Sequence, residues 1–423
     1  MSTDALTGLV AARDAGVPRG ITSVCSAHEL VIEAALLQAA QDGTEALVEA
    51  TCNQVNQDGG YTGMTPAGFR DLVLGIAARI GFAPERVVLG GDHLGPNPWR
   101  HLPAEQAMDR AERMVAAYVA AGFAKLHLDA SMGCAGEPAT LPDEVVAGRA
   151  VRLAVRAEAA AAAAAARPVY VIGTEVPTPG GATEALDHLR PTTPEAVLAT
   201  YAVHEQAFRE AAPAAWPRVL AIVVQPGVEF GHEDVAIYRP ERAAALSDAL
   251  RHMPGLVFEA HSTDYQPEAA LRRLVVDGFA ILKVGPGLTF ALREALYGLD
   301  AIDAVLNPGG PRLPVTMEAL MLARPEHWRT HYPGATTEQH MLRHYSYSDR
   351  IRYYWPAAEA RKTVDALLER LGRAVIPAAL ISQHLPGLYE RVVASQLKVE
   401  PRALLIELVR DVLRTYSHAC GNG

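Results

Sequence analysis

The sequence predicts an α/β fold, a (β/α)8 TIM barrel followed by a helical extension at the C-terminal end. Between Ile21 and Leu306, eight short apolar runs alternate with stretches that carry helical signals. Strict alternation of strand and helix gives parallel strands joined by right-handed crossovers. Eight such units favour a closed barrel over an open sheet. After Phe290 the pattern becomes helical, which predicts the extension.

The predicted strands share an apolar body, and each ends in a polar residue or a glycine-rich turn. They are Ile21–Cys25, Ala46–Thr51, Val87–His93, Ala124–Asp129, Val169–Glu175, Ala221–Gln225, Leu256–His261 and Phe279–Lys283. Parallel α/β sheets gather functional groups at the carboxyl ends of their strands. We therefore expect the polar residues at these ends to form one shared site.

The predicted helices between the strands open with proline or aspartate in several cases, which is a helix-start signal. They are His28–Ala40, Pro66–Ile80, Ala104–Ala121, Pro142–Ala166, Thr193–Ala211, Pro240–Met253, Pro267–Asp277 and Ala291–Leu306. The last of these is expected to supply the eighth helix of the barrel.

A loop at Pro308–Pro311 marks the start of the extension. Beyond it, three further helices are predicted, at Val315–Trp328, Ala357–Leu371 and Ala403–Ser417. We therefore divide the chain into a barrel, residues 1–306, and a C-terminal helical extension, residues 307–423, that packs on the barrel.

The composition excludes several classes of protein. The 423 residues carry 38 basic and 48 acidic side chains, a formal charge of −10, which disfavours binding to nucleic acid or to an anionic membrane. No stretch is convincing as a membrane span. The N-terminus does not resemble a signal peptide. The 4 cysteines form no C-x-x-C pair, and this pattern suits a reducing compartment. We expect a cytoplasmic protein with a small-molecule ligand.

His93 and His261 are the best candidates for metal ligands, because each stands at a predicted strand end. Neutral imidazole suits Zn, Mn, Co or Ni. Glu175 and Asp129 offer hard oxygen ligands at equivalent depth, and Gln225 could complete the shell or bind a sugar hydroxyl. The alternative is a set of hydrogen-bonded residues on the barrel rim. Burying several carboxylates and imidazoles together is costly unless a cation or ligand pairs them, which favours the metal site.

Asp92 and Lys283 are the candidates for acid–base chemistry, with Asp129 as a second acid. Side chains alternate along a regular strand, so Asp92 and His93 share a site only at a strand end or a bulge. Asp92 would then act as a general base, or alternatively as a cap for the following turn. Lys283 could form a Schiff base, but neutralising carboxylates or binding a substrate oxygen is the favoured interpretation.

Two polar segments are expected to contact substrate. The glycine-rich loop after the second strand offers amides for hydroxyl groups, and the segment Ser348–Tyr353 offers arginines. With residues of the first two strands, the expected substrate contacts are His28, Glu49, Asn53, Gln54, Asn56, Gln225, Arg350 and Arg352. The arginine segment could instead be an interface or a packing element. The turn Gly285–Gly287 could hold a phosphate at a helix start, or simply be a tight turn.

The chain contains long motifs at Ser23–His28, Glu49–Gln57, Gly90–Pro96, Glu259–Gln266 and Asp349–Pro356. These motifs closely resemble the tagatose-1,6-bisphosphate aldolase non-catalytic subunit family. The resemblance covers nearly the whole chain. It implies an accessory subunit that supports a class II aldolase, although some members of the family are metal-dependent tagatose 4-epimerases.

The site also resembles that of class II aldolases. The resemblance implies that Asp92 is the base and His93 a zinc ligand, that His261 is the ligand from the seventh strand, and that Glu175 is an acidic site residue. The departure is on the sixth strand, where Gln225 stands in place of a histidine.

Two hypotheses follow from the residues and the resemblance. The first is a metal-dependent ketohexose 4-epimerase that interconverts tagatose and fructose by retro-aldol chemistry. The second is a non-catalytic stabilising subunit of a class II tagatose-1,6-bisphosphate aldolase. We expect a ketose or ketose phosphate as ligand, with a class II aldolase catalytic subunit and a second copy of the chain as candidate protein partners.

Overall fold

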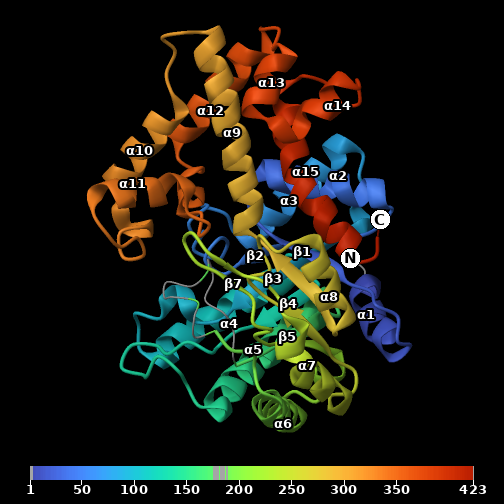
Figure 1. The fold of residues 1–423 in the computed structure, drawn as a ribbon. Coiled ribbons are helices and arrows are strands. Elements are labelled where there is room, and N and C mark those ends of the chain that lie inside the picture. The colour runs from blue at the N-terminus through green and yellow to red at the C-terminus, as the bar shows by residue number, and fades with distance from the viewer. Residues whose placement is uncertain (1–2, 175–180, 182–185, 187–188, 423) are drawn as a thin grey trace.

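Eight parallel strands close into a barrel in the computed structural model, which describes residues 3–174, 181, 186 and 189–422 (Figure 1). The barrel strands are β1 (Ile21–Cys25), β2 (Ala46–Thr51), β3 (Val87–Leu94), β4 (Lys125–Leu128), β5 (Val169–Ile172), β6 (Val219–Val223), β9 (Val257–Ala260) and β10 (Phe279–Val284). β1 pairs with both β2 and β10, which closes the sheet. The predicted (β/α)8 barrel is therefore confirmed.

Seven helices alternate with these strands at the positions that the sequence predicts. They are α2 (Glu29–Asp42), α3 (Pro66–Ile80), α4 (Ala104–Ala120), α5 (Asp143–Ala164), α6 (Pro194–Ala211), α7 (Pro240–Ala249) and α8 (Glu268–Val276). Local chemistry fixes their ends. The Thr65 hydroxyl accepts a hydrogen bond from the Gly68 amide at the start of α3, and Gly81 closes α3 in the left-handed conformation.

The eighth position of the helical wall is filled by α15 (Pro401–Ala419), the last helix of the described chain. α15 packs against α2, α8 and β1. α9 (Pro286–Leu306) instead leaves the barrel and packs against α15, α12 and α13 (Figure 1). The expectation that Ala291–Leu306 forms the eighth barrel helix is therefore wrong, because helical periodicity does not say which neighbour a helix packs on. The division of the chain at residue 306 remains a prediction.

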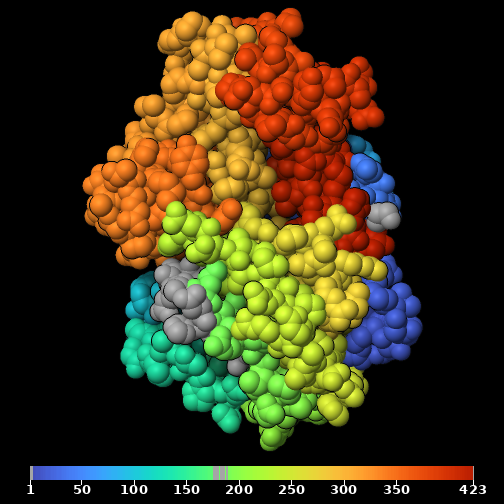
Figure 2. All heavy atoms as spheres, in the orientation of Figure 1, coloured from blue at the N-terminus to red at the C-terminus, as the bar shows by residue number. Residues whose placement is uncertain are grey.

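The remaining C-terminal helices form a lobe beside α9, seen in orange and red above the barrel in Figure 2. They are α10 (Leu313–Ala323), α11 (Thr336–Tyr345), α12 (Ala358–Gly372), α13 (Ala378–His384) and α14 (Tyr389–Val393). A 3-10 helix at Arg350–Tyr354 contacts α9, α10 and α11. A short antiparallel pair, β7 (Glu229–Phe230) and β8 (Val235–Ala236), follows β6 and was not predicted.

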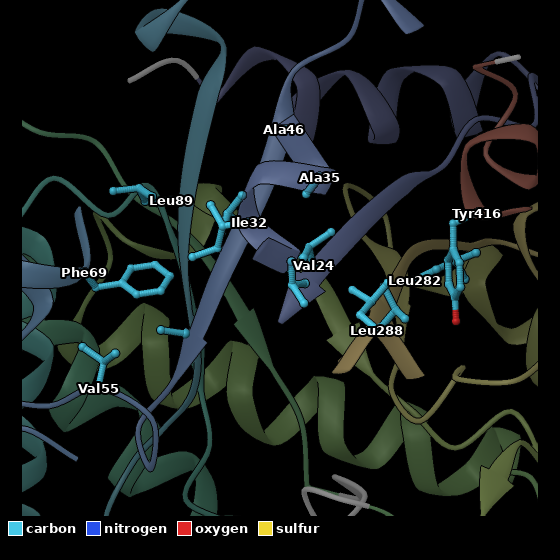
Figure 3. Packing of buried hydrophobic residues seen from close by; sticks show 14 of the residues in the cluster. Val24, Ile32, Ala35, Ala46, Val55, Phe69, Leu89, Leu282, Leu288 and Tyr416 are labelled. Atoms are coloured by element: carbon cyan, nitrogen blue, oxygen red, sulfur yellow. The ribbon is translucent and has the colours of Figure 1, made fainter. Parts of the chain in front are cut away.

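Two apolar cores lie on the two sides of the barrel wall. The larger one fills the space between strands and helices, where Val24 of β1, Ile32 of α2 and Tyr416 of α15 are buried (Figure 3). The smaller one lies within the barrel and includes Leu6 and Leu9 of α1 (Asp4–Asp14), a helix that the sequence analysis did not predict. α1 thus closes the end of the barrel opposite to the carboxyl ends of the strands.

Among the described residues, the helices are all too short or too polar to cross a membrane. This finding agrees with the absence of a membrane span in the sequence analysis.

The chain after β3 passes very close to the backbone that follows β4. A Cβ atom placed on Gly95 would lie 1.6 Å from the Asp129 carbonyl oxygen, which only a backbone shift can relieve. We expect Gly95→Ala to lower the free energy of unfolding by roughly 3 kcal/mol or more, because overpacking displaces both segments. Denaturant unfolding measures the effect. Gly75→Ala in α3, where nothing lies within 4 Å, is the matched control and should be neutral or stabilising. Equal stability of the two variants would contradict the prediction.

Candidate active site

A cavity of about 500 Å³ opens at the carboxyl ends of the barrel strands. Its wall includes Asp92, His93, His261 and Lys283, which come from β3, β9 and β10. Arg352 of the 3-10 helix also lines the cavity, and the part of the wall that comes from outside the barrel strands is called the outer wall. The cavity therefore lies where the sequence predicts the shared site.

Three histidines meet beneath this cavity. The ring centroid of His93 lies 5.1 Å from that of His127 and 4.9 Å from that of His261, and the rings of His127 and His261 are 5.1 Å apart. They come from three different strands, since His127 lies on β4 and His261 follows β9. Only the barrel brings them together.

Backbone distortion brings the Asp92 and His93 side chains into the same site. The pairing of β3 with β4 shifts register between Gly91 and Leu94, and His93 has a φ of 48°. Ser262, beside His261, has a φ of 51°. Non-glycine residues in this region cost of order 1–3 kcal/mol each, and such strain is concentrated at functional sites.

Each histidine pairs one ring nitrogen with a buried carboxylate. His93 Nδ1 lies 2.7 Å from Asp129 Oδ2, and His127 Nδ1 lies 2.9 Å from Asp92 Oδ1. His261 Nε2 lies 2.9 Å from a Glu259 oxygen. Carboxylate partners of this kind orient histidines that bind metals. Among the described residues, none forms a hydrogen bond with the buried His127 Nε2, so this nitrogen can bind a ligand atom.

Two buried lysines connect the carboxylates into one network. Lys125 Nζ lies 2.7 Å from Glu49 and 2.8 Å from Glu259. Lys283 Nζ lies 3.0 Å from Asp92 and also pairs with Glu49. The side chains of these residues are at most 5% exposed, so water contributes little to neutralising them. Asp92 and Glu259 each contact both an ammonium group and an imidazole, and so link the lysines to the histidines.

With neutral histidines, the network carries a formal charge of −2, because its two ammonium groups face four carboxylates. The carboxylates are those of Glu49, Asp92, Asp129 and Glu259. Uncompensated buried charge is costly. A divalent cation would balance this charge, and imidazole with carboxylate is a donor set that suits Zn²⁺ and related ions. His127, His261, Asp92 and Glu259 each offer a ligand atom within 4.8 Å of the others, and His93 adjoins them. The residues present therefore fit a divalent metal.

The pKa values of the histidines reflect the negative charge of the carboxylates. Burial lowers the pKa of a histidine, yet Asp92 and Asp129 more than offset this and raise the pKa of His93 above its ordinary value. Burial lowers the pKa of His261 to about 4 despite Glu259, so this ring is neutral and can act as a ligand.

Four of the predicted substrate contacts line the cavity: His28, Asn53, Gln54 and Arg352. The loop after β2 meets the arginine segment directly, because the Tyr61 and Tyr353 rings are 4.6 Å apart. The two polar segments that the sequence singled out therefore form one outer wall.

The other predicted site residues are not among the described residues that line the cavity. Asn56 binds the Cys52 carbonyl oxygen and two loop amides, and Gln225 accepts hydrogen bonds from the Gly227 and Val228 amides. Both side chains therefore stabilise the conformation of their own loops through hydrogen bonds to the backbone. Arg350 is buried and donates to the His327 carbonyl oxygen. Glu49 and Asp129 stand behind the cavity wall, in the ion network and beside His93. Glu175 lies outside the described residues.

The start of α9 is already occupied by a carboxylate. Asp264 Oδ1 accepts hydrogen bonds from the Gly285 amide at 2.9 Å and the Gly287 amide at 2.7 Å. Of the two interpretations of this turn, the hydrogen bonds favour the tight turn, because a phosphate at these two amides would have to displace the Asp264 carboxylate.

Sequence reasoning missed three residues of the site, namely Lys125, His127 and Glu259. The signal was present in the two-residue period of a strand. Lys125, His127 and Asp129 alternate with leucines, so they share one face of β4, and Glu259 shares a face with His261. These residues were missed because the sequence analysis considered only the ends of the strands.

The comparisons with known proteins agree with the fold and the motifs. Residues 6–421 match a family described as D-tagatose-1,6-bisphosphate aldolase subunit GatZ/KbaZ-like. The chain belongs to this family. The resemblance inferred from the sequence motifs is thereby confirmed.

Two relatives of this GatZ/KbaZ-like chain align over nearly its whole length. A protein of Agrobacterium fabrum (strain C58 / ATCC 33970), named D-tagatose 6-phosphate 4-epimerase, is 53% identical over 425 residues, which cover 100% of this chain and 99% of the relative. A crystal structure from Sinorhizobium meliloti 1021, called a probable tagatose 6 phosphate kinase, is 55% identical with a TM-score of 0.89 and covers 95% of this chain and 100% of its own.

Asp349 immediately precedes the 3-10 helix that carries Arg352, and its protonation can be tested by unfolding experiments. Its φ is 47°, and its Oδ2 accepts a hydrogen bond from Thr289 Oγ1 at 2.5 Å. Burial raises the pKa of Asp349 to about 7, although Arg352 opposes the shift. The folded state therefore keeps a proton that the unfolded chain, with a pKa of about 3.9, releases at lower pH. The stability associated with this proton is complete below about pH 4 and is lost as the pH rises through about 7.

Asn at position 349 resembles the protonated acid and tolerates the left-handed conformation. We expect Asp349→Asn to gain stability relative to wild type as the pH rises from about 4 to about 7, by roughly 1–4 kcal/mol, with no further gain above that range. Urea unfolding at several pH values measures the difference. Asp109→Asn, at an exposed position of α4, is the control. A pH-independent difference for Asp349→Asn would show that this carboxyl is not protonated in the folded state.

Proposed function

We propose that this chain is a metal-dependent 4-epimerase that interconverts tagatose 6-phosphate and fructose 6-phosphate by retro-aldol chemistry. The observation that carries the proposal is the set of three histidines at the barrel mouth, each paired with a buried carboxylate. The name of the 53% identical relative supports the substrate class.

Inversion at C4 requires bond cleavage, because the C4 hydrogen of a ketose is not acidic. Removal of the C4 hydroxyl proton allows the C3–C4 bond to break, with its electron pair passing into the C2 carbonyl group. The fragments are an enediolate of C1–C3 and an aldehyde of C4–C6. When the aldehyde presents its other face, the same bond re-forms and the C4 oxygen regains a proton. The overall reaction needs neither an oxidant nor a reductant.

When bound at this site, a divalent cation would stabilise the negative charge that develops as the C3–C4 bond breaks. His93, His127 and His261 would hold it. Asp129 and Glu259 would fix the ring orientations of His93 and His261.

Asp92 is the group that moves the C4 hydroxyl proton in this proposal. It lines the cavity, whereas Asp129 does not. Asp92 Oδ2 lies 3.0 Å from Lys283 Nζ. Although burial raises the pKa of a carboxyl group, His93 and Lys283 lower the pKa of Asp92 well below its ordinary value. Asp92 is therefore ionised and ready to accept a proton.

Lys283 acts as a charge partner in this proposal, and not as a Schiff-base nucleophile. Burial lowers the pKa of a lysine, but Asp92 and Glu49 outweigh burial and raise the pKa of Lys283 well above its ordinary value. A lysine that stays protonated cannot attack a carbonyl carbon.

Arg352 is the proposed contact for the substrate phosphate. Its guanidinium donates to the Ser348 and Asp349 carbonyl oxygens at 2.5 and 3.0 Å and stacks over Tyr353. Within the described part of the chain it forms no ion pair with a carboxylate. A guanidinium on a cavity wall without such a partner suits an anionic group.

The decisive test is an assay of the isolated chain with added divalent metals and tagatose 6-phosphate, with formation of fructose 6-phosphate as the readout. Activity that a chelator abolishes and metal restores supports the proposal. The accessory-subunit hypothesis predicts no turnover at any metal concentration, together with stabilisation of a class II aldolase partner. That pair of results would contradict the epimerase proposal and support the accessory-subunit hypothesis.

Asp92 and Asp129 should respond differently to the loss of charge. We expect Asp92→Asn to lower kcat by about 10²–10⁴-fold even at saturating metal, because a general base is lost. We expect Asp129→Asn to weaken metal affinity by about 10–100-fold, because His93 loses its orienting partner. Steady-state kinetics and elemental analysis on the same samples separate the two effects. Comparable kcat and metal content in both variants would argue against the assigned roles.

Arg352 should discriminate phosphorylated from free ketose. We expect Arg352→Ala to raise KM for tagatose 6-phosphate by roughly 10-fold or more, the effect of losing one charge-assisted contact of about 1.5–3 kcal/mol. The KM for free tagatose should change little, and Arg352→Lys should restore part of the phosphate effect. Parallel kinetics on both sugars provide the check. An equal loss on both would mean that Arg352 supports the wall but does not contact the phosphate.

A further inference from the structure

A second cluster of metal-binding side chains lies in the C-terminal lobe, away from the barrel mouth. His340 and His344 are four residues apart on α11, so they share one face of the helix. Glu318 reaches them from α10. One ligand atom from each of these three residues lies within 4.8 Å of the others.

The distances suit a small tetrahedral ion. His340 Nδ1 lies 3.1 Å from Glu318 Oε1, and His344 Nε2 lies 3.2 Å from Glu318 Oε2. Two ligands bound 2.0–2.1 Å from a tetrahedral Zn²⁺ ion stand roughly 3.3 Å apart. Both histidine–carboxylate distances are close to this spacing, and an ion bound to both rings would contact one or both of the Glu318 oxygens.

Further contacts hold two of the ligands in place. The Tyr297 hydroxyl of α9 lies 2.6 Å from His344 Nδ1, which leaves His344 Nε2 directed at Glu318. Arg343 donates to both oxygens of Glu318, at 2.8 and 2.5 Å. Bound histidines and carboxylates in metal sites have such outer partners. Each carboxylate oxygen keeps a second lone pair for a ligand.

We propose that Glu318, His340 and His344 form a second metal site, selective for Zn²⁺ or a cation of similar softness. Two imidazoles and one carboxylate provide three ligands, and water completes the tetrahedron on the solvent side, where the His340 side chain is 55% exposed. The bound ion joins α10 to α11 and, through Tyr297, to α9. Since α9, α10 and α11 all contact the 3-10 helix that carries Arg352, the ion stiffens the support of the outer cavity wall.

The test compares the number of Zn²⁺ ions per chain in wild type, His340→Ala and His418→Ala. His418 pairs with the single carboxylate of Glu268 at 3.2 Å and is half exposed, which makes it the matched control. Each protein is stripped with a chelator, titrated with Zn²⁺ against a competing chromophoric chelator, and examined by elemental analysis. Thermal midpoints without metal confirm that the variants fold.

Wild type and His418→Ala are expected to bind one ion more per chain than His340→Ala. Excess Zn²⁺ is expected to raise the thermal midpoint of wild type more than that of His340→Ala, because the ion binds only the folded site. Glu318→Gln should behave like His340→Ala. Equal stoichiometry in wild type and His340→Ala would overturn the proposal. The difference does not depend on metal binding at the barrel mouth, because both proteins retain that site.

Discussion

The ion pairs of Lys125 organise the interior of this barrel. One buried ammonium group contacts Glu49 of β2 and Glu259 of β9, two strands on opposite sides of β4 in the closed sheet. Each carboxylate then holds the next group of the site: Glu49 pairs with Lys283 and Glu259 with His261. Removing one partner of a buried ion pair leaves an unpaired charge, at a cost of about 3–5 kcal/mol. The positions of the His261 ring and of Lys283 therefore depend on the Lys125 amino group, although Lys125 does not line the cavity.

The site also depends on backbone conformations that most residues avoid. Of the positive-φ non-glycine residues in the described chain, His93 and Ser262 line the cavity. The surrounding packing must compensate for this strain. Apolar packing inside the barrel, at the end that α1 closes, supports the strands that carry these strained residues. The molecule thus divides into a stable end and a reactive end, the arrangement common to (β/α)8 enzymes.

Periodicity was enough to predict the strands and most helices, because each buries one face against the same core. Strand ends were enough to find Asp92, His93, His261 and Lys283, which the cavity brings together. Packing partners were not predictable in this way. α15 fills the position expected for α9, and the amide of Gln225, placed at a strand end, holds its own loop. Residues inside the barrel, such as His127, are found only when the alternation along a strand is followed inward.

The position of α15 in the helical wall has a consequence for folding in the cell. Residues 401–419 leave the ribosome long after the last barrel strand, and domains form as units during synthesis. Until then, the faces of α2 and α8 that α15 covers remain open to water or to other proteins. The nascent barrel therefore exposes the apolar faces of α2 and α8 until residues 401–419 have been synthesised.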